Sequence, residues 1–146
     1  MKNLILFFSI ILFTIACDKN DEPTSNFQEQ IMGEWQINSF VINSCPDPEN
    51  NLAFTVSDDE GCLDVMGQTT CVSILFSENG KATFRDSQIS GADGVLTMTY
   101  ELDECTSTIK ICGDGQDCQT FSLREDGLYN EMDESGCICT FGYKKM

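Results

Sequence analysis

The chain has 146 residues, a length that fits one folded domain. Its 24 Asp and Glu residues against 8 Lys and Arg give a net charge of −16, so phosphate backbones would repel it and no nucleic-acid partner is expected. It contains no histidine, which removes Ser-His-Asp and Cys-His catalysis and histidine-based metal sites. Nine cysteines indicate an oxidising compartment.

Residues 1–16 have the pattern of a secretory signal peptide. A short basic start, Met1-Lys2-Asn3, precedes an apolar run from Leu4 to Ile15, which is too short to cross a bilayer about 30 Å thick. The run ends in Thr14-Ile15-Ala16-Cys17, and a small residue directly before cysteine resembles the lipobox of bacterial lipoproteins. The resemblance implies cleavage before Cys17 and attachment of acyl chains such as palmitate to that residue. The alternative is an ordinary signal peptide, with Cys17 paired in the fold.

The cysteine count gives a second argument for lipidation. Without Cys17, eight cysteines remain, and an even set can pair fully in an oxidising space. We therefore expect disulfides among Cys45, Cys62, Cys71, Cys105, Cys112, Cys118, Cys137 and Cys139.

Residues 17–28 are predicted to form the lipidated cysteine and a flexible tether, because the segment is polar and has no apolar anchor. Its acidic cluster, Asp18 to Glu22, resembles the export signal of surface lipoproteins of the Bacteroidetes group. The alternative is a solvated spacer that carries no address. The folded domain is predicted over residues 29–146, where helical periodicity is absent apart from one turn at Phe27 to Met32.

The folded domain reads as a series of short antiparallel strands. Apolar residues alternate with polar ones, and signals for tight turns such as Asn79-Gly80, Asp126-Gly127 and Ser135-Gly136 separate the segments. The predicted strands are 34–43, 52–57, 71–77, 81–86, 95–102, 107–112, 118–124, 128–133 and 137–144.

Matching the apolar faces of neighbouring strands predicts the register. A five-residue loop, Gly113 to Asp117, places Cys112 opposite Cys118 at about 4.5–5.5 Å, which a disulfide can span. Cys62–Cys71 is the next expected bridge because it closes a short loop, and the pairing of the other four cysteines stays open. The other expected opposite pairs include Phe76 with Ala82, Tyr100 with Ile109, Leu123 with Asn130, and Met132 with Cys139.

Sequential hairpins predict an all-β fold, a small disulfide-rich antiparallel up-and-down barrel, because closure removes exposed strand edges. A two-sheet β-sandwich is the alternative. Gly33-Glu34-Trp35 opens the first strand and resembles the Gly-x-Trp signature of lipocalins and bacterial lipocalin-like lipoproteins. The segment from Cys71 to Gly80 resembles a central hairpin of the same proteins. The resemblance covers residues 33 to about 143 and implies that Trp35 plugs the closed end of a barrel.

A barrel of this kind implies binding of a small apolar molecule in its interior. The alternative function is a non-catalytic structural or interaction lipoprotein that docks to another envelope protein. Each candidate lining residue has a second interpretation as plain core. These candidates are Trp35, Ile37, Met98, Tyr100, Ile109, Phe121 and Met132.

Catalysis, a cofactor and a bound metal are not expected. The carboxylate clusters Asp58-Asp59-Glu60, Asp103-Glu104 and Asp133-Glu134 fall in turns, whereas acid–base chemistry needs carboxylates held in a dry cleft. The loop Asp114 to Asp117 offers oxygen atoms to Ca²⁺ without the usual Ca²⁺-loop pattern, and Cys137-x-Cys139 favours disulfides over zinc. The expected location is the bacterial cell envelope, on the outer membrane, with the lipid anchor as the membrane contact.

Overall fold

The computed structural model describes residues 25–146 except 57–60, 66, 88–93, 114 and 116–117. The described part contains helix α1 (Ser25–Ile31), a short 3₁₀-helix η1 (Pro48–Asn50) and a ten-stranded antiparallel sheet. The strands are β1 (Gly33–Asn43), β2 (Leu52–Thr55), β3 (Cys62–Val65), β4 (Gln68–Ser77), β5 (Lys81–Asp86), β6 (Val95–Asp103), β7 (Thr108–Cys112), β8 (Gln119–Arg124), β9 (Gly127–Glu134) and β10 (Cys137–Lys145).

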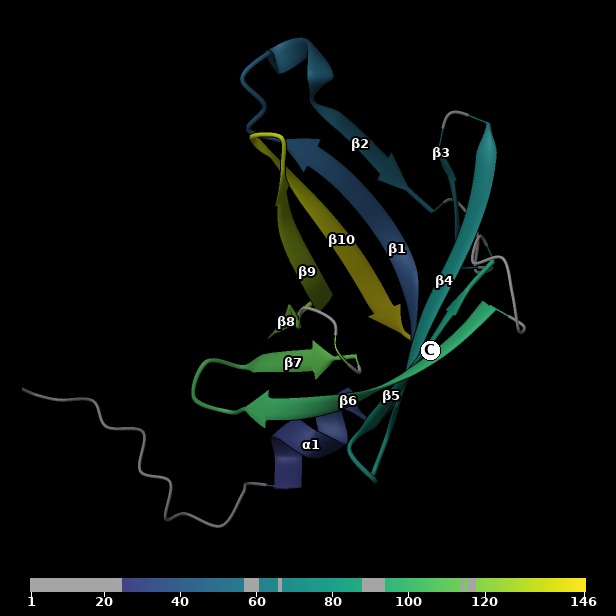
Figure 1. Cartoon of the computed structure of the whole chain (residues 1–146), viewed down its shortest axis with the longest axis vertical. Helices are drawn as coiled ribbons and strands as arrows, with labels where there is room; N and C mark the ends of the chain where they lie inside the picture. The colour runs from purple at the N-terminus through teal and green to yellow at the C-terminus, as the bar shows by residue number, and fades with distance from the viewer. Residues whose placement is uncertain (1–24, 57–60, 66, 88–93, 114, 116–117) are drawn as a thin grey trace, which may run out of the picture.

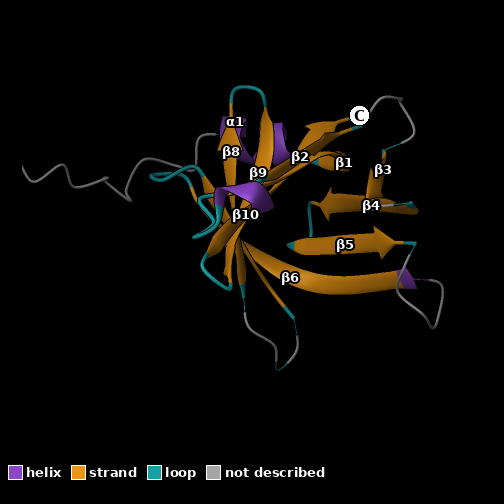
Figure 2. Ribbon diagram, turned by 90° about the horizontal axis from the view of Figure 1, so that it is seen from above, coloured by secondary structure: helices purple, strands orange, loops and turns teal. Residues whose placement is uncertain are grey.

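Eight of the strands close into a barrel. The order around it is β1-β10-β9-β8-β7-β6-β5-β4, and pairing of β1 with β4 completes the ring. Viewed from above, β4, β5 and β6 lie side by side along one wall (Figure 2). The predicted up-and-down barrel is therefore confirmed, its architecture is consistent with a small lipocalin-like barrel, and ring closure rules out the sandwich.

Strand β1 changes its partner halfway along its length. Gly33 to Gln36 pair with β4, Ser39 to Ile42 pair with β2, and β10 follows the other edge throughout. The register against β10 shifts at Asn38, where the change of partner occurs. An extra residue reverses which side chains face inward, so Ile37 faces the core before the bulge and Phe40 packs against the core after it. The bulge lets β1 leave β4 and opens this end of the barrel, where β2 and β3 lie (Figure 1).

Helix α1 closes the other end of the barrel (Figure 1). Phe27 and Ile31 bury their side chains in the core, and the Trp35 indole Nε1–H donates a hydrogen bond of 2.8 Å to the Ile31 carbonyl. The Lys145 ammonium donates to the Gln30 carbonyl at 2.8 Å and lies 5.9 Å from the centre of the Trp35 ring. Two of the carbonyls that a helix leaves unpaired at its C-terminus are thus satisfied. This helix begins at Ser25, within the segment expected to be a tether.

Two of the described disulfides are the predicted ones. Cys62 and Cys71 lie directly opposite each other on β3 and β4 and are bonded. Cys112 and Cys118 are bonded across the β7–β8 turn, with their Cα atoms 4.2 Å apart. Strand β3 itself was not among the predicted strands, although the bridge that fastens it was.

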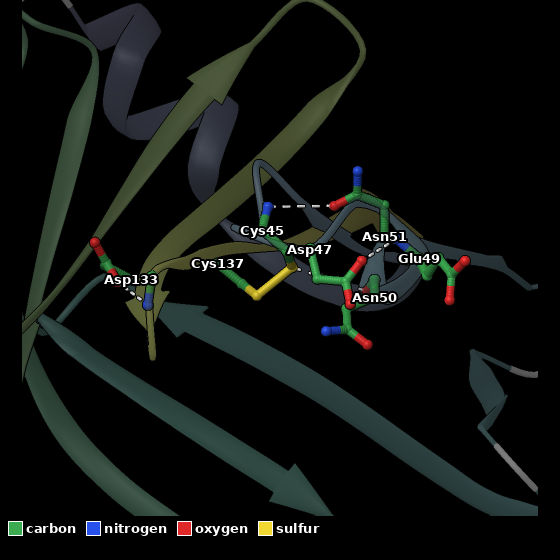
Figure 3. Close-up of a disulfide and its surroundings, with 8 residues drawn as sticks. Cys45, Asp47, Glu49, Asn50, Asn51, Asp133 and Cys137 are labelled. Carbon is green, nitrogen blue, oxygen red and sulfur yellow. Dashed lines mark hydrogen bonds between the residues drawn. A yellow bond between two sulfur atoms is a disulfide. The ribbon is translucent and has the colours of Figure 1, made fainter.

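The third described disulfide, Cys45–Cys137, joins the loop after β1 to the start of β10 (Figure 3). Its two ends are ordered by side-chain hydrogen bonds. The Cys45 N–H donates to Asn51 Oδ1 at 3.3 Å, and the Gly136 N–H donates to Asp133 Oδ1 at 3.2 Å. The bond therefore joins two turns at the open end, each of which has a side-chain hydrogen bond of its own.

Cys139 departs from the predicted disulfide pairing. It is a free thiol with only 5% of its surface exposed, so the prediction that it forms a disulfide is wrong. The register places Ile42 and Met132 beside it, so no cysteine lies directly opposite on either neighbouring strand. Cys105 is disulfide-bonded. With Cys139 unpaired, the even count no longer argues for setting Cys17 apart, and lipidation rests on the pattern around Cys17.

The predicted register holds in the β4–β5 and β9–β10 hairpins. Phe76 lies opposite Ala82, across a three-residue loop that ends in left-handed Gly80 (φ 71°). Met132 lies opposite Cys139. Gly80 and Gly136 take positive φ in these turns, where glycine is favoured, which is why the sequence predicts both turns well.

Two other hairpins are shifted by two residues from the predicted register. Tyr100 lies opposite Ile111 instead of Ile109, because the β6–β7 turn extends to Ser107, which adopts a left-handed conformation (φ 52°). Leu123 lies opposite Leu128 instead of Asn130, because Gly127 belongs to β9 and not to the turn. A shift of two keeps every side chain on its expected face, so the core was assigned correctly although the pairs were not.

Candidate functional site

A cavity of about 420 Å³ lies at the open end of the barrel, where β1 has left β4. This volume falls in the range of small-molecule sites. Seven strands contribute to its wall. The described lining residues are Ile37, Phe40, Leu63, Gln68, Thr70, Val72, Asp86, Gln119, Asn130, Met132, Phe141 and Tyr143.

Aromatic rings form one wall of the cavity. Phe40 and Phe141 are directly paired across β1 and β10, and their rings stack with centroids 4.7 Å apart and planes inclined by 22°. Phe54 lies directly opposite Phe40 on β2, and these two rings stack with their centroids 6.2 Å apart. The two strands fix both rings, so a flat apolar molecule would meet a surface that is already in place.

Polar groups line the cavity beside the aromatic rings, since Asn130 lies directly opposite Phe141 on β9 and Tyr143 follows Phe141 on β10. Asn130 is only 4% exposed and donates a 3.0 Å hydrogen bond from Nδ2 to the Thr120 carbonyl, which fixes its amide. Burial raises the pKa of the Tyr143 hydroxyl, and the nearby Asp86 carboxylate raises this pKa further. The Tyr143 hydroxyl therefore stays neutral at physiological pH and offers one hydrogen-bond donor.

Two of the seven predicted lining residues, Ile37 and Met132, line this cavity. The others belong to the packed part of the barrel. Tyr100 is buried and donates a 2.8 Å hydrogen bond to the Ser77 carbonyl, and Met98 packs partly buried against the core. The remaining three are core residues that do not line the cavity: Trp35, Ile109 and Phe121.

Sequence reasoning missed the aromatic wall and the carboxylate. Strict alternation from Trp35 and Ile37 would place Phe40 outside the barrel, and no sequence signal revealed the bulge that brings it inside. Ala82 and Phe84 alternate on the inner face of β5, and the same alternation places Asp86 on that face. Because Asp86 is charged, the alternation was not extended to it.

The acidic clusters that were weighed for catalysis have turn-forming roles where they are described. Asp103 accepts a hydrogen bond from the Cys105 N–H at 3.1 Å, and Asp133 accepts one from the Gly136 N–H at 3.2 Å. Asp58-Asp59-Glu60 and three of the four positions from Asp114 to Asp117 lie outside the described residues. Within the described part, no group of three or more His, Cys, Asp or Glu side chains could hold a metal ion.

No protein-family model, curated protein or solved structure matches this chain. Among the residues that the structure describes, no helix is long and apolar enough to span a bilayer. The three described disulfides are compatible with an extracytoplasmic location, where such bonds form and persist.

The buried thiol of Cys139 should be inert in the folded protein. We expect iodoacetamide to leave Cys139 unmodified under native, non-reducing conditions and to alkylate it completely in about 6 M guanidinium chloride, because denaturant exposes the thiol. Peptide mapping by mass spectrometry locates the label. Rapid alkylation of Cys139 in the native protein, or its recovery in a disulfide, would contradict the register described above.

Proposed function

We propose that this chain is a lipid-anchored, extracytoplasmic, lipocalin-like protein that binds a small, largely apolar molecule at the open end of its barrel. The observation that carries the proposal is the cavity of about 420 Å³, which combines an aromatic wall with a few polar groups. Small-molecule sites usually have this composition, and β-barrels commonly provide them at their mouths.

The division of the barrel into two parts supports this function. The end near α1 is filled by Trp35, Phe76 and Ile109, which are all at least 96% buried. These residues supply the stability that a partly hollow barrel lacks elsewhere. The disulfides Cys62–Cys71 and Cys45–Cys137 hold elements beside the cavity, so its walls keep their positions without a filled interior.

Lipid anchoring is supported by the residues around Cys17, which lie outside the described part of the chain. It is tested by mass spectrometry of the amino-terminal peptide of protein purified from its own host. We expect the peptide to begin at Cys17 and to carry acyl chains on that residue. Recovery of Cys17 in a disulfide, with Cys105 for example, would contradict the anchor and leave the cavity proposal standing.

Docking to another envelope protein has less support. In the described part, the exposed large apolar side chains are Val95, Leu96, Met132 and Met146, which fall at three separate places along the chain. A stable docking surface requires a larger continuous apolar patch. We therefore favour the small-molecule function.

A variant that fills the cavity tests the ligand-binding function. Val72 lines the cavity, so Val72→Trp should occupy the space of a ligand. Thr97→Trp is the matched control, because Thr97 is exposed on β6. Native mass spectrometry of protein from its own host should show a small molecule retained by the wild type and by Thr97→Trp, and lost from Val72→Trp. An empty wild-type protein, or retention of the same mass by Val72→Trp, would contradict the proposed site.

A further inference from the structure

The described wall of the cavity contains one charged side chain, Asp86. Asp86 lies directly opposite Val72, on the face of β5 that also carries Phe84 and the buried Ala82. Its carboxylate is near enough to the buried Tyr143 hydroxyl to affect that group electrostatically. Asp86 makes a further interaction, and a carboxylate has acceptor capacity for several hydrogen bonds at once.

None of the described basic residues lines the cavity. Arg85, which adjoins Asp86, is exposed and pairs with Glu34 at 3.5 Å. Arg124 pairs with Glu131 at 2.6 Å, and Lys145 contacts the end of α1. Lys81 and Lys110 are exposed, and Lys144 on β10 does not line the cavity and makes an interaction of its own. A bound carboxylate would therefore meet a wall whose one described charge is negative.

Charge and shape together define a class of ligand. A carboxylate placed beside Asp86 would lose hydration and gain repulsion, whereas an ammonium group would form a charge-assisted hydrogen bond there. The stacked rings of Phe40 and Phe141 would meanwhile take the apolar part of the same molecule. The net charge of −16 adds a long-range attraction for cations.

We propose that the cavity selects amphipathic molecules with an apolar ring system and a cationic amine, and discriminates against fatty acids and other apolar carboxylates. Asp86 is the residue that meets the amine. This inference rests on the proposed function, because it names the class of molecule that the same cavity takes.

Three probes with one ring system and different end groups test the inference. They are 2-(1-naphthyl)ethylamine, 2-(1-naphthyl)ethanol and 1-naphthylacetate, each titrated by calorimetry into the purified protein after removal of bound small molecules. We expect the amine to bind about ten- to a hundredfold more tightly than the carboxylate, the range given by one hydrogen bond to a charged group. Val72→Trp should lose binding of all three probes.

Two charge-removing variants separate a local effect from the general attraction of an acidic protein. Asp86→Asn should lower the affinity for the amine to within about twofold of that for the alcohol, because the amide keeps the shape and loses the charge. Glu101→Gln removes the same charge from an exposed position on β6 and should leave all three affinities within about twofold of wild type.

The outcomes distinguish the inference from the function on which it rests. If the alcohol binds and the amine binds no better, or if Asp86→Asn keeps the preference for the amine, the assignment to Asp86 is overturned and the ligand-binding function stands. If none of the three probes binds the wild-type protein, the inference and the proposed function both fail.

Discussion

Replacing Trp35 with alanine is expected to lower the free energy of unfolding by about 3–5 kcal/mol, the cost of removing a large, well-packed aromatic side chain. Trp35 is 4% exposed and joins the barrel to α1 through its hydrogen bond to the Ile31 carbonyl. The variant would leave a hole at the closed end and an unpaired helix carbonyl. Urea denaturation followed by circular dichroism measures the change without relying on tryptophan fluorescence.

Trp35→Phe is the matched control, since it keeps most of the packing and loses the indole hydrogen bond. We expect it to cost about 1–2 kcal/mol. If Trp35→Ala lowered the free energy of unfolding by less than about 1 kcal/mol, the closed end would not depend on the Trp35 side chain. That result would contradict the cost that is usual for buried aromatic residues.

The second large effect concerns the disulfide that joins the loop after β1 to the start of β10. Cys45 and Cys137 are separated by 92 positions, whereas Cys112 and Cys118 are separated by 6. In the chain-entropy description, the longer loop gives about 4–5 kcal/mol of stabilisation and the shorter loop about 2–2.5 kcal/mol. The double variant Cys45→Ala/Cys137→Ala should therefore be about 2 kcal/mol less stable than Cys112→Ala/Cys118→Ala.

Denaturation of the two double variants under non-reducing conditions measures this difference directly. Both variants lose one bond and two sulfur atoms, so the comparison isolates the effect of loop length. Equal stabilities, or a greater loss from the Cys112 and Cys118 variant, would mean that the long bridge does not constrain the unfolded chain as the entropy description requires.

Local signals predicted much of the barrel. The Cys112–Cys118 bridge follows from alternation on two strands and a short loop, and the β4–β5 hairpin follows from Asn79-Gly80. Each depends on a few neighbouring residues, for which side-chain period and turn chemistry are sufficient. The turn residues after β6 and β8 permit more than one loop length. The sequence therefore predicted which side chains of these hairpins face inward, but not which residues lie opposite each other.

Features that depend on distant segments were out of reach. The bulge at Asn38 occurs where β1 exchanges β4 for β2, and this exchange depends on how the whole ring closes. Cys45–Cys137 and the isolation of Cys139 depend on the same closure. The cavity depends on local alternation and on ring closure together. Ile37 and Met132 were predicted to line it, whereas Phe40, Phe141 and Asp86 were not.

The most direct test is an NMR titration of the isotopically labelled protein with 2-(1-naphthyl)ethylamine. The chain has one tryptophan, so the indole N–H of Trp35 gives one signal that reports on the closed end. We expect ligand-induced shifts in the backbone amides of Phe40 and Phe141 and in the side-chain amide of Asn130, with the Trp35 indole signal unchanged. Shifts centred on Trp35, or no shifts anywhere in the barrel, would contradict a ligand site at the open end.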